Sequence, residues 1–107
     1  MVVDEYLVEQ EKVIDALYDP DGHFAKMSEA EVNYESMLSV EIVKAKEIHG
    51  STLAKDIAKG SDAVIQVKKD WLEAERKVKK SQAKITFIQN CYEADKLRTR
   101  INMKVDH

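Results

Sequence analysis

From Ala63 onward the chain contains no residue that breaks a helix for roughly forty residues, and this constrains the fold more than any other feature. The three glycines and the single proline all lie at or before residue 60. Because Gly60-Ser61-Asp62 has the form of a stop followed by a cap, the sequence predicts one helix from about residue 61 to 103. At ~1.5 Å per residue this helix would be about 60 Å long. It is too long to be covered by a single companion of ordinary length.

Apolar residues recur along this predicted helix at heptad spacing. One series, at intervals of seven residues, comprises Val64, Trp71, Val78, Ile85 and Tyr92. A second series supplies Val67, Ala74 and Ile88, and is interrupted by Ser81 and Asp95. Such spacing is typical of coiled-coil packing. After the last member of the first series the apolar positions move to Leu97 and Ile101, which predicts a change of packing neighbours. Trp71, Val78, Ile85, Ile88 and Tyr92 are termed the heptad seam below.

The part of the chain before Gly60 predicts two further helices and a connector. Apolar spacing indicates a first helix over residues 2–18, followed by a turn at Asp19-Pro20-Asp21-Gly22 and a loop over residues 19–27. Ser28-Glu29-Ala30-Glu31 has the form of a capping box, so a second helix is predicted over residues 28–49. Residues 51–59 could form either a short helix or a loose connector.

These elements predict an all-α fold in one domain, residues 1–107. We expect a helical hairpin with one long C-terminal helix, an additional N-terminal helix and coiled-coil-like packing. The first two helices could pack in tandem along the long one, or part of the long helix could project and find another subunit. We expect a homo-oligomer with the heptad seam as its interface, because Trp71, Ile85, Phe87 and Tyr92 are hard to bury within so small a hairpin.

Charge is split unevenly along the chain. Residues 1–41 carry eleven acidic residues and two lysines, a formal charge of −9, and residues 42–107 carry fifteen basic and nine acidic residues, a formal charge of +6. This division indicates either pairing between the two parts or two different partners.

The basic residues of the long helix lie at positions outside the heptad seam and are candidates for binding nucleic acid. They are Lys68, Lys69, Arg76, Lys77, Lys79, Lys80 and Lys84, continued by Lys96, Arg98, Arg100 and Lys104. Such a stripe can follow a phosphate backbone without reading its sequence. The alternative is a solvated face that is partly paired to neighbouring acids such as Glu73 and Glu75.

The acidic residues of the first part offer a second candidate surface. Glu5, Glu9 and Asp15 on the first helix could present a negative face to a basic partner protein. Alternatively, these acids complement helix dipoles and face the protein's own basic helix.

Other chemistry finds little support. Asp19-Pro20-Asp21-Gly22 lacks the glutamate that a calcium loop needs at its twelfth position, where Ala30 stands. His23, His49 and His107 have no partners at metal-ligand spacing, and Cys91 has no neighbouring histidine. We expect surface histidines, a buried or half-buried thiol, no enzymatic activity, no metal and no cofactor. The lone cysteine and the lack of a long apolar run predict a soluble cytoplasmic protein that does not contact membranes.

The layout from Val32 to Arg100 resembles small helical accessory proteins encoded by bacteriophages, in particular the UvsY family of recombination mediators from T4-type phages. The features are a helix running from Tyr34-Glu35-Ser36-Met37-Leu38 to Lys44-Ala45-Lys46-Glu47, a short insert, and a lysine-rich helix that ends in Leu97-Arg98-Thr99-Arg100-Ile101. The resemblance implies an oligomer that binds single-stranded DNA and helps to load a recombinase, with Lys68 to Lys84 as the DNA face. The acidic first helix departs from that pattern.

Two functional hypotheses follow. The first is a non-enzymatic, oligomeric helical accessory protein that binds nucleic acid or a nucleoprotein partner. The alternative is an inhibitor or adaptor, such as a phage counter-defence protein, that binds a basic protein target through its acidic first helix. A purely structural coiled-coil module would use neither charged surface.

Overall fold

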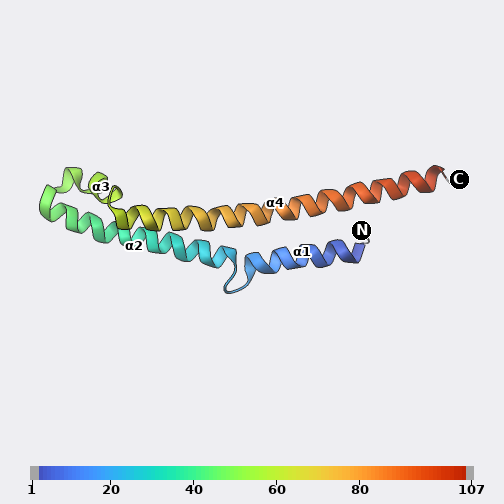
Figure 1. Cartoon of the computed structure of the whole chain (residues 1–107), viewed down its shortest axis with the longest axis horizontal. Coiled ribbons are helices and arrows are strands. Elements are labelled where there is room, and N and C mark those ends of the chain that lie inside the picture. The colour runs from blue at the N-terminus through green and yellow to red at the C-terminus, as the bar shows by residue number, and fades with distance from the viewer. Residues whose placement is uncertain (1–2, 106–107) are drawn as a thin grey trace.

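A computed structural model describes residues 3–105 and the side chains of residues 4–103. The described chain is all-α and consists of α1 (Val3–Tyr18), α2 (His23–His49), α3 (Ser51–Lys59) and α4 (Asp62–Val105). Figure 1 shows α1 and α2 lying one after the other along α4, with α3 at the turn that joins α2 to α4. The predicted hairpin with an additional N-terminal helix is therefore confirmed, and its tandem form is the one observed.

The connection between α1 and α2 is shorter than the sequence predicts. The expected loop over residues 19–27 is wrong, because α2 already begins at His23. The amide of Gly22 donates to the carbonyl of Asp19 at 2.7 Å, and the amide of Lys26 donates to the carbonyl of Gly22 at 3.0 Å. The turn is thus complete at Gly22, and the Ser28 capping-box pattern lies inside the helix.

Glycine is required at this turn by space. A Cβ atom on Gly22 would lie 2.7 Å from the carbonyl oxygen of Ala16 and 2.9 Å from that of Leu17. No side chain fits against backbone at these distances. Across the turn, the rings of Tyr18 and Phe24 pack with their centroids 5.0 Å apart. The turn therefore holds the end of α1 close to the start of α2.

Residues 51–59 form a helix, which decides between the two predicted states of this segment. Gly50 stands between α2 and α3 with φ of 79°, a conformation that glycine adopts at low cost. Ala54 and Ala58 are buried on the inner side of α3. Ser61 then caps α4, since its Oγ accepts a hydrogen bond of 3.3 Å from the amide of Val64.

The molecule is a rod, with extents of 81 × 25 × 16 Å. Because α1 and α2 together cover most of α4 from one side, the 44 residues of α4 find partners in tandem rather than in one long companion. The C-terminal end of α4 extends past the N-terminal end of α1 (Figure 1).

The heptad seam is packed inside this chain. Val78 and Ile88 are only 4% and 5% exposed, and Ile88 forms a core with Tyr6 and Val13 of α1. Ile85 and Tyr92 pack against that core, and Trp71 lies against Tyr34 of α2 with ring centroids 5.3 Å apart. The assignment of the seam to an oligomer interface is therefore corrected. Two helices in tandem bury Val78 and Ile88 and half-bury the other three seam residues, whereas the sequence analysis expected so small a hairpin to leave the large side chains hard to bury.

We predict that Ile88→Ala lowers the free energy of unfolding by about 2–4 kcal/mol, because it opens a cavity between α1 and α4. The matched control is Leu72→Ala, which truncates an apolar side chain of the same helix that is 48% exposed. This substitution should change the free energy of unfolding by less than about 1 kcal/mol. Urea denaturation followed by circular dichroism measures both. Equal effects of the two substitutions would contradict the observed packing of the seam.

Candidate functional site

Apart from Lys96, whose Nζ lies 5.8 Å from the ring centroid of Tyr92, the basic candidates with described side chains on α4 fall into three groups according to what surrounds them. Lys68 is half-buried, and its Nζ lies 4.8 Å from the ring centroid of Tyr34 and 4.6 Å from that of Trp71. Cation–π attraction of this kind holds the ammonium over the two rings. Lys68 thus helps to join α2 to α4, and the sequence analysis missed this role because it depends on a contact between two distant segments.

The second group consists of bases that pair with acids of the same helix. The Nη1 of Arg76 lies 2.8 Å from the Oε2 of Glu73, and the Nζ of Lys79 lies 2.7 Å from the Oε1 of Glu75. The Nη1 of Arg98 lies 3.3 Å from the Oδ1 of Asp95. The hydrogen bond from Lys79 is the main cause that lowers the pKa of the Glu75 carboxyl. These pairs span three or four residues on exposed surface, and each contributes little to stability. Their cations are partly compensated.

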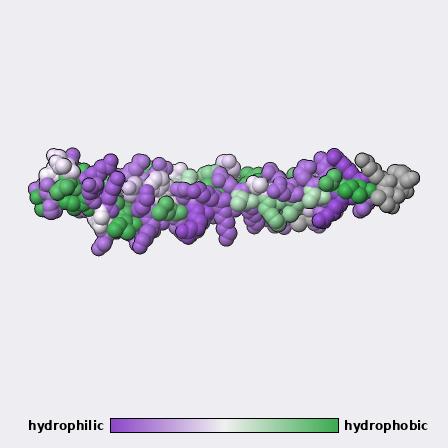
Figure 2. Space-filling view, turned by 90° about the horizontal axis from the view of Figure 1, so that it is seen from above, coloured by the Kyte–Doolittle hydropathy of each residue, from purple (hydrophilic) through white to green (hydrophobic). Residues whose placement is uncertain are grey.

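The third group has no ion-pair partner among the residues whose side chains are described. It comprises Lys69, Lys77, Lys80, Lys84 and Arg100, all exposed. Lys77, Lys80 and Lys84 are spaced by three and four residues, so they share one face of the helix. Figure 2, which views the molecule from above the orientation of Figure 1, shows a surface that is hydrophilic over much of its length and interrupted by hydrophobic residues. The side chain of Lys104 and all of His107 lie outside the described part.

The acids of the N-terminal part do not neutralise these lysines directly. The four ion pairs between described side chains each join residues of one helix, either α2 or α4. Glu5, Glu9 and Asp15 are exposed on α1 and take part in none of them. The predicted pairing of the acidic and basic parts is thus not formed as contact ion pairs within the described residues.

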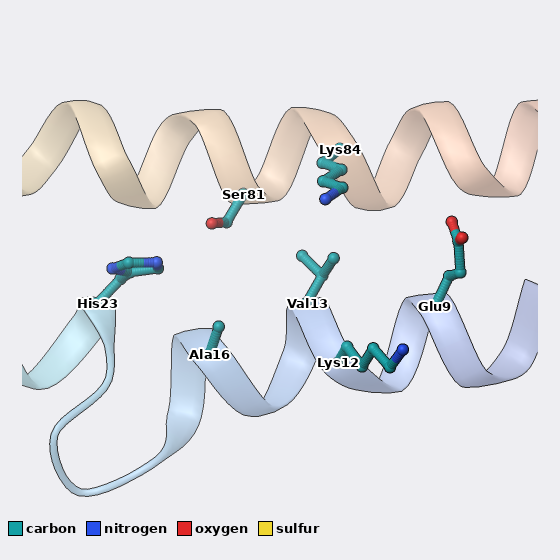
Figure 3. Close-up of a pocket in the computed structure, with 7 residues that line it drawn as sticks. All are labelled: Glu9, Lys12, Val13, Ala16, His23, Ser81 and Lys84. Atoms are coloured by element: carbon teal, nitrogen blue, oxygen red, sulfur yellow. The ribbon is translucent and has the colours of Figure 1, made fainter.

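Acidic and basic side chains meet only loosely, in a groove where α1 ends and α2 begins. The groove has a volume of about 340 Å³ and is lined by Glu9, Lys12, Val13, Ala16, His23, Ser81 and Lys84. Figure 3 shows Glu9 extending toward α4 and Lys84 toward α1. The groove is open and of mixed charge, so it offers neither an enclosed pocket nor a uniformly positive one.

A hydrogen-bonded contact fixes the other end of α1 on α4. The Tyr6 hydroxyl donates to the Asp95 carboxylate and lies 3.3 Å from the carbonyl oxygen of Cys91, and the Tyr6 ring meets Tyr92 edge-on at 5.5 Å. The hydrogen bond to Asp95 is the main cause that raises the pKa of Tyr6 to about 12, and it lowers the pKa of Asp95. Asp95, which interrupts the apolar series in the sequence, therefore has a structural role.

Several other kinds of site are absent from the described part of the chain. No three or more histidine, cysteine, aspartate or glutamate residues among the described ones could together hold a metal ion. Within residues 3–105 no helix is both long enough and apolar enough to cross a membrane. Cys91 is half-buried and forms no disulfide with any described residue.

The fold and surface define an elongated all-α protein with exposed apolar side chains and an exposed basic helix face. Comparison of the chain with protein-family models, with curated proteins and with solved structures finds no match.

We predict that Tyr6→Phe weakens the attachment of α1, and that the effect depends on pH. A carboxyl whose pKa is lowered in the folded state stabilises it above the unfolded pKa, about 3.9 for aspartate, and that stabilisation is lost as the pH falls through the lowered value. The stability difference between wild type and Tyr6→Phe should therefore stay constant from roughly pH 6 to 8 and shrink below about pH 4.

Tyr18→Phe is the matched control, because the Tyr18 ring is exposed and packs only on Phe24 among the aromatic residues described. Thermal unfolding across the pH series measures both variants. A difference for Tyr6→Phe that is independent of pH down to pH 2 would show that Asp95 does not accept this hydrogen bond in solution.

Proposed function

We propose that this protein is a non-enzymatic accessory protein that binds nucleic acid, alone or within a nucleoprotein complex, through the basic face of α4. The residues that carry the proposal are Lys69, Lys77, Lys80 and Lys84, with Arg76 beside them. Four further bases contribute positive charge but are less available to a ligand. Lys68 lies over the rings of Tyr34 and Trp71, and Lys79 and Arg98 are paired with acids of α4. Arg100 is more distant along the helix.

The observation that carries the proposal is the absence of ion pairs between the acidic α1 and the basic α4 among the described side chains. Had the acids of α1 paired with these lysines, binding a polyanion would first require breaking those pairs. The exposed lysines instead keep their counterions, and the release of these ions favours binding to phosphates.

The shape of the molecule fits the same proposal. Catalysis requires reacting groups held in a water-excluding pocket, whereas the grooves of this rod are open and are lined by a mixture of charged and apolar residues. A straight helix with lysines on one side contacts successive phosphates without discriminating among bases. Binding to single-stranded DNA and assistance to a recombinase are the narrower form of the proposal, and they rest on the resemblance in layout alone.

A second candidate function is the binding of a basic protein partner by α1. The observation that favours it is the exposure of Glu5, Glu9 and Asp15, which take part in none of the ion pairs between described residues. A row of free carboxylates can be complementary to a positive surface on another protein.

We predict that the protein binds labelled single-stranded DNA with an affinity that falls steeply with salt. Replacing Arg76, Lys80 and Lys84 together by glutamate should abolish binding at near-physiological salt, because three phosphate contacts become repulsive. Fluorescence anisotropy over a salt series measures the affinity and its salt slope, with double-stranded DNA measured in parallel.

The matched control replaces Lys44, Lys46 and Lys55 by glutamate, which changes the net charge by the same amount on α2 and α3. It should retain most of the binding. Equal loss with both triple variants would mean that only the overall charge matters, and no binding by the wild type even at low salt would refute the proposal. If the wild type binds no DNA, a variant in which Glu5, Glu9 and Asp15 are replaced together by lysine tests the second candidate function, because it should lose the ability to bind a basic protein.

A further inference from the structure

A second apolar stripe runs along the C-terminal half of α4. Its residues are spaced alternately by four and three, and they are Ala83, Phe87, Asn90, Ala94, Leu97 and Ile101. All six are exposed; Phe87 is 66%, Leu97 56% and Ile101 52% exposed. If the heptad seam occupies the first and fourth heptad positions, this set occupies the third and sixth, on the opposite side of the helix. We term it the outer stripe.

The helix face that carries the outer stripe is apolar only in its C-terminal half. The same spacing continued toward the N-terminal end of α4 reaches Lys80, Arg76, Glu73 and Lys69. A solvated helix face is expected to be charged throughout, as this upstream segment is. The change to Phe, Leu and Ile beyond Ala83 indicates that this half is covered in the working state of the protein.

We propose that the outer stripe binds the outer stripe of a second copy of this chain, as a parallel, in-register two-stranded coiled coil. Phe87, Ala94 and Ile101 would form one core series, and Ala83, Asn90 and Leu97 the other. Asn90 is the single polar residue of the two series, and pairing in register places it opposite Asn90 of the other copy, whereas a shifted register would bury each amide against an apolar residue without a hydrogen-bond partner. This interface goes beyond the proposed function and does not depend on it.

Charge complementarity identifies the second copy as the occupant. Glu93 and Arg98 flank the outer stripe and are separated by five residues, the offset at which side chains meet across a parallel coiled coil. Glu93 of one copy therefore meets Arg98 of the other, and the two-fold axis repeats the pair. Glu93 forms no ion pair with any described residue, and the Arg98 side chain is 78% exposed, at 3.3 Å from Asp95.

The extent of the interface follows from the same residues. From Ala83 to Ile101 the helix rises about 27 Å. Farther upstream, Lys80 would face Lys80 of the other copy, and Arg76 would face Arg76. The repulsion between these like charges makes the two helices diverge. A single helix face of this length is smaller than the ~800 Å² per partner of a standard interface, so association in the micromolar range is expected.

Analytical ultracentrifugation of the full chain over a range of concentrations tests the proposal. The wild type should dimerise, and Leu97→Glu should weaken dimerisation about a hundredfold or more, because each dimer loses two buried leucines and gains two opposed charges. Leu72→Glu is the matched control, since it changes the same residue type on the same helix at 48% exposure but outside the outer stripe. It should dimerise like the wild type.

A wild type that remains monomeric at several hundred micromolar would overturn the proposal, and the outer stripe would then belong to a different partner helix. A Leu97→Glu variant that dimerises as well as the wild type, or a Leu72→Glu variant that does not dimerise, would also overturn it. Circular dichroism of each variant verifies that α4 is intact.

Charge exchange and cross-linking test the orientation. Arg98→Glu should weaken the dimer, and Glu93→Arg added to it should restore the affinity. In a Cys91→Ala background, Ala94→Cys should form a disulfide with its own copy under mild oxidation, because a parallel, in-register pair places Ala94 opposite Ala94, whereas an antiparallel pair centred on the outer stripe places it opposite Asn90. Cross-linking of Ala94→Cys to Asn90→Cys in a mixture, without self-cross-linking, would show an antiparallel dimer and overturn the proposed geometry.

Discussion

Burial of the heptad seam against two helices in tandem is the interaction on which the rest of the structure depends. A 16-residue helix such as α1 is marginal alone, because isolated helices of this length gain too little from propensity. Its buried face consists of Tyr6, Val13 and Leu17, and the first two meet Ile88 of α4. Over its described side chains, residues 62–103, the long helix in turn has no other buried face. Each element is therefore ordered by the others, and the seam couples them.

The polar residues that interrupt the second apolar series mark where α1 lies on α4. Ser81 lines the groove at the C-terminal end of α1, near Ala16 and His23. Asp95 accepts a hydrogen bond from the hydroxyl of Tyr6 near the N-terminal end of α1. Between these two positions the seam is apolar. Ser81 is tolerated because it lines an open groove, where water can hydrogen-bond its hydroxyl. Asp95 is tolerated because the hydroxyl of Tyr6 donates a hydrogen bond to its carboxylate.

Much of the fold could be predicted from the sequence because its signals are local. Heptad spacing identified the buried face of α4, and Gly50 and Gly60 identified the ends of α2 and α3. The start of α2 was misplaced because two competing signals lie six residues apart, and the close packing of Gly22 against the end of α1 is not visible in a sequence.

Contacts between distant residues are what the sequence analysis missed. The Tyr6–Asp95 hydrogen bond joins residues 89 positions apart, and the cation–π contacts of Lys68 depend on the register between α2 and α4. The basic candidates were identified as a set, but only the structure separates clamped, paired and free members. The apolar residues beyond Tyr92 were noticed as a drift of the seam, whereas with Phe87 they form one stripe on the opposite face.

The two proposed surfaces of α4 are arranged so that occupying one favours the other. The free lysines lie mainly in the N-terminal half and the outer stripe in the C-terminal half, so neither covers the other. In a parallel dimer the two basic segments diverge side by side, and the repulsion between their lysines limits the length of the coiled coil. A polyanion bound between them would remove that repulsion. It would also engage twice as many cations, which makes its affinity and its salt dependence larger than those of one chain.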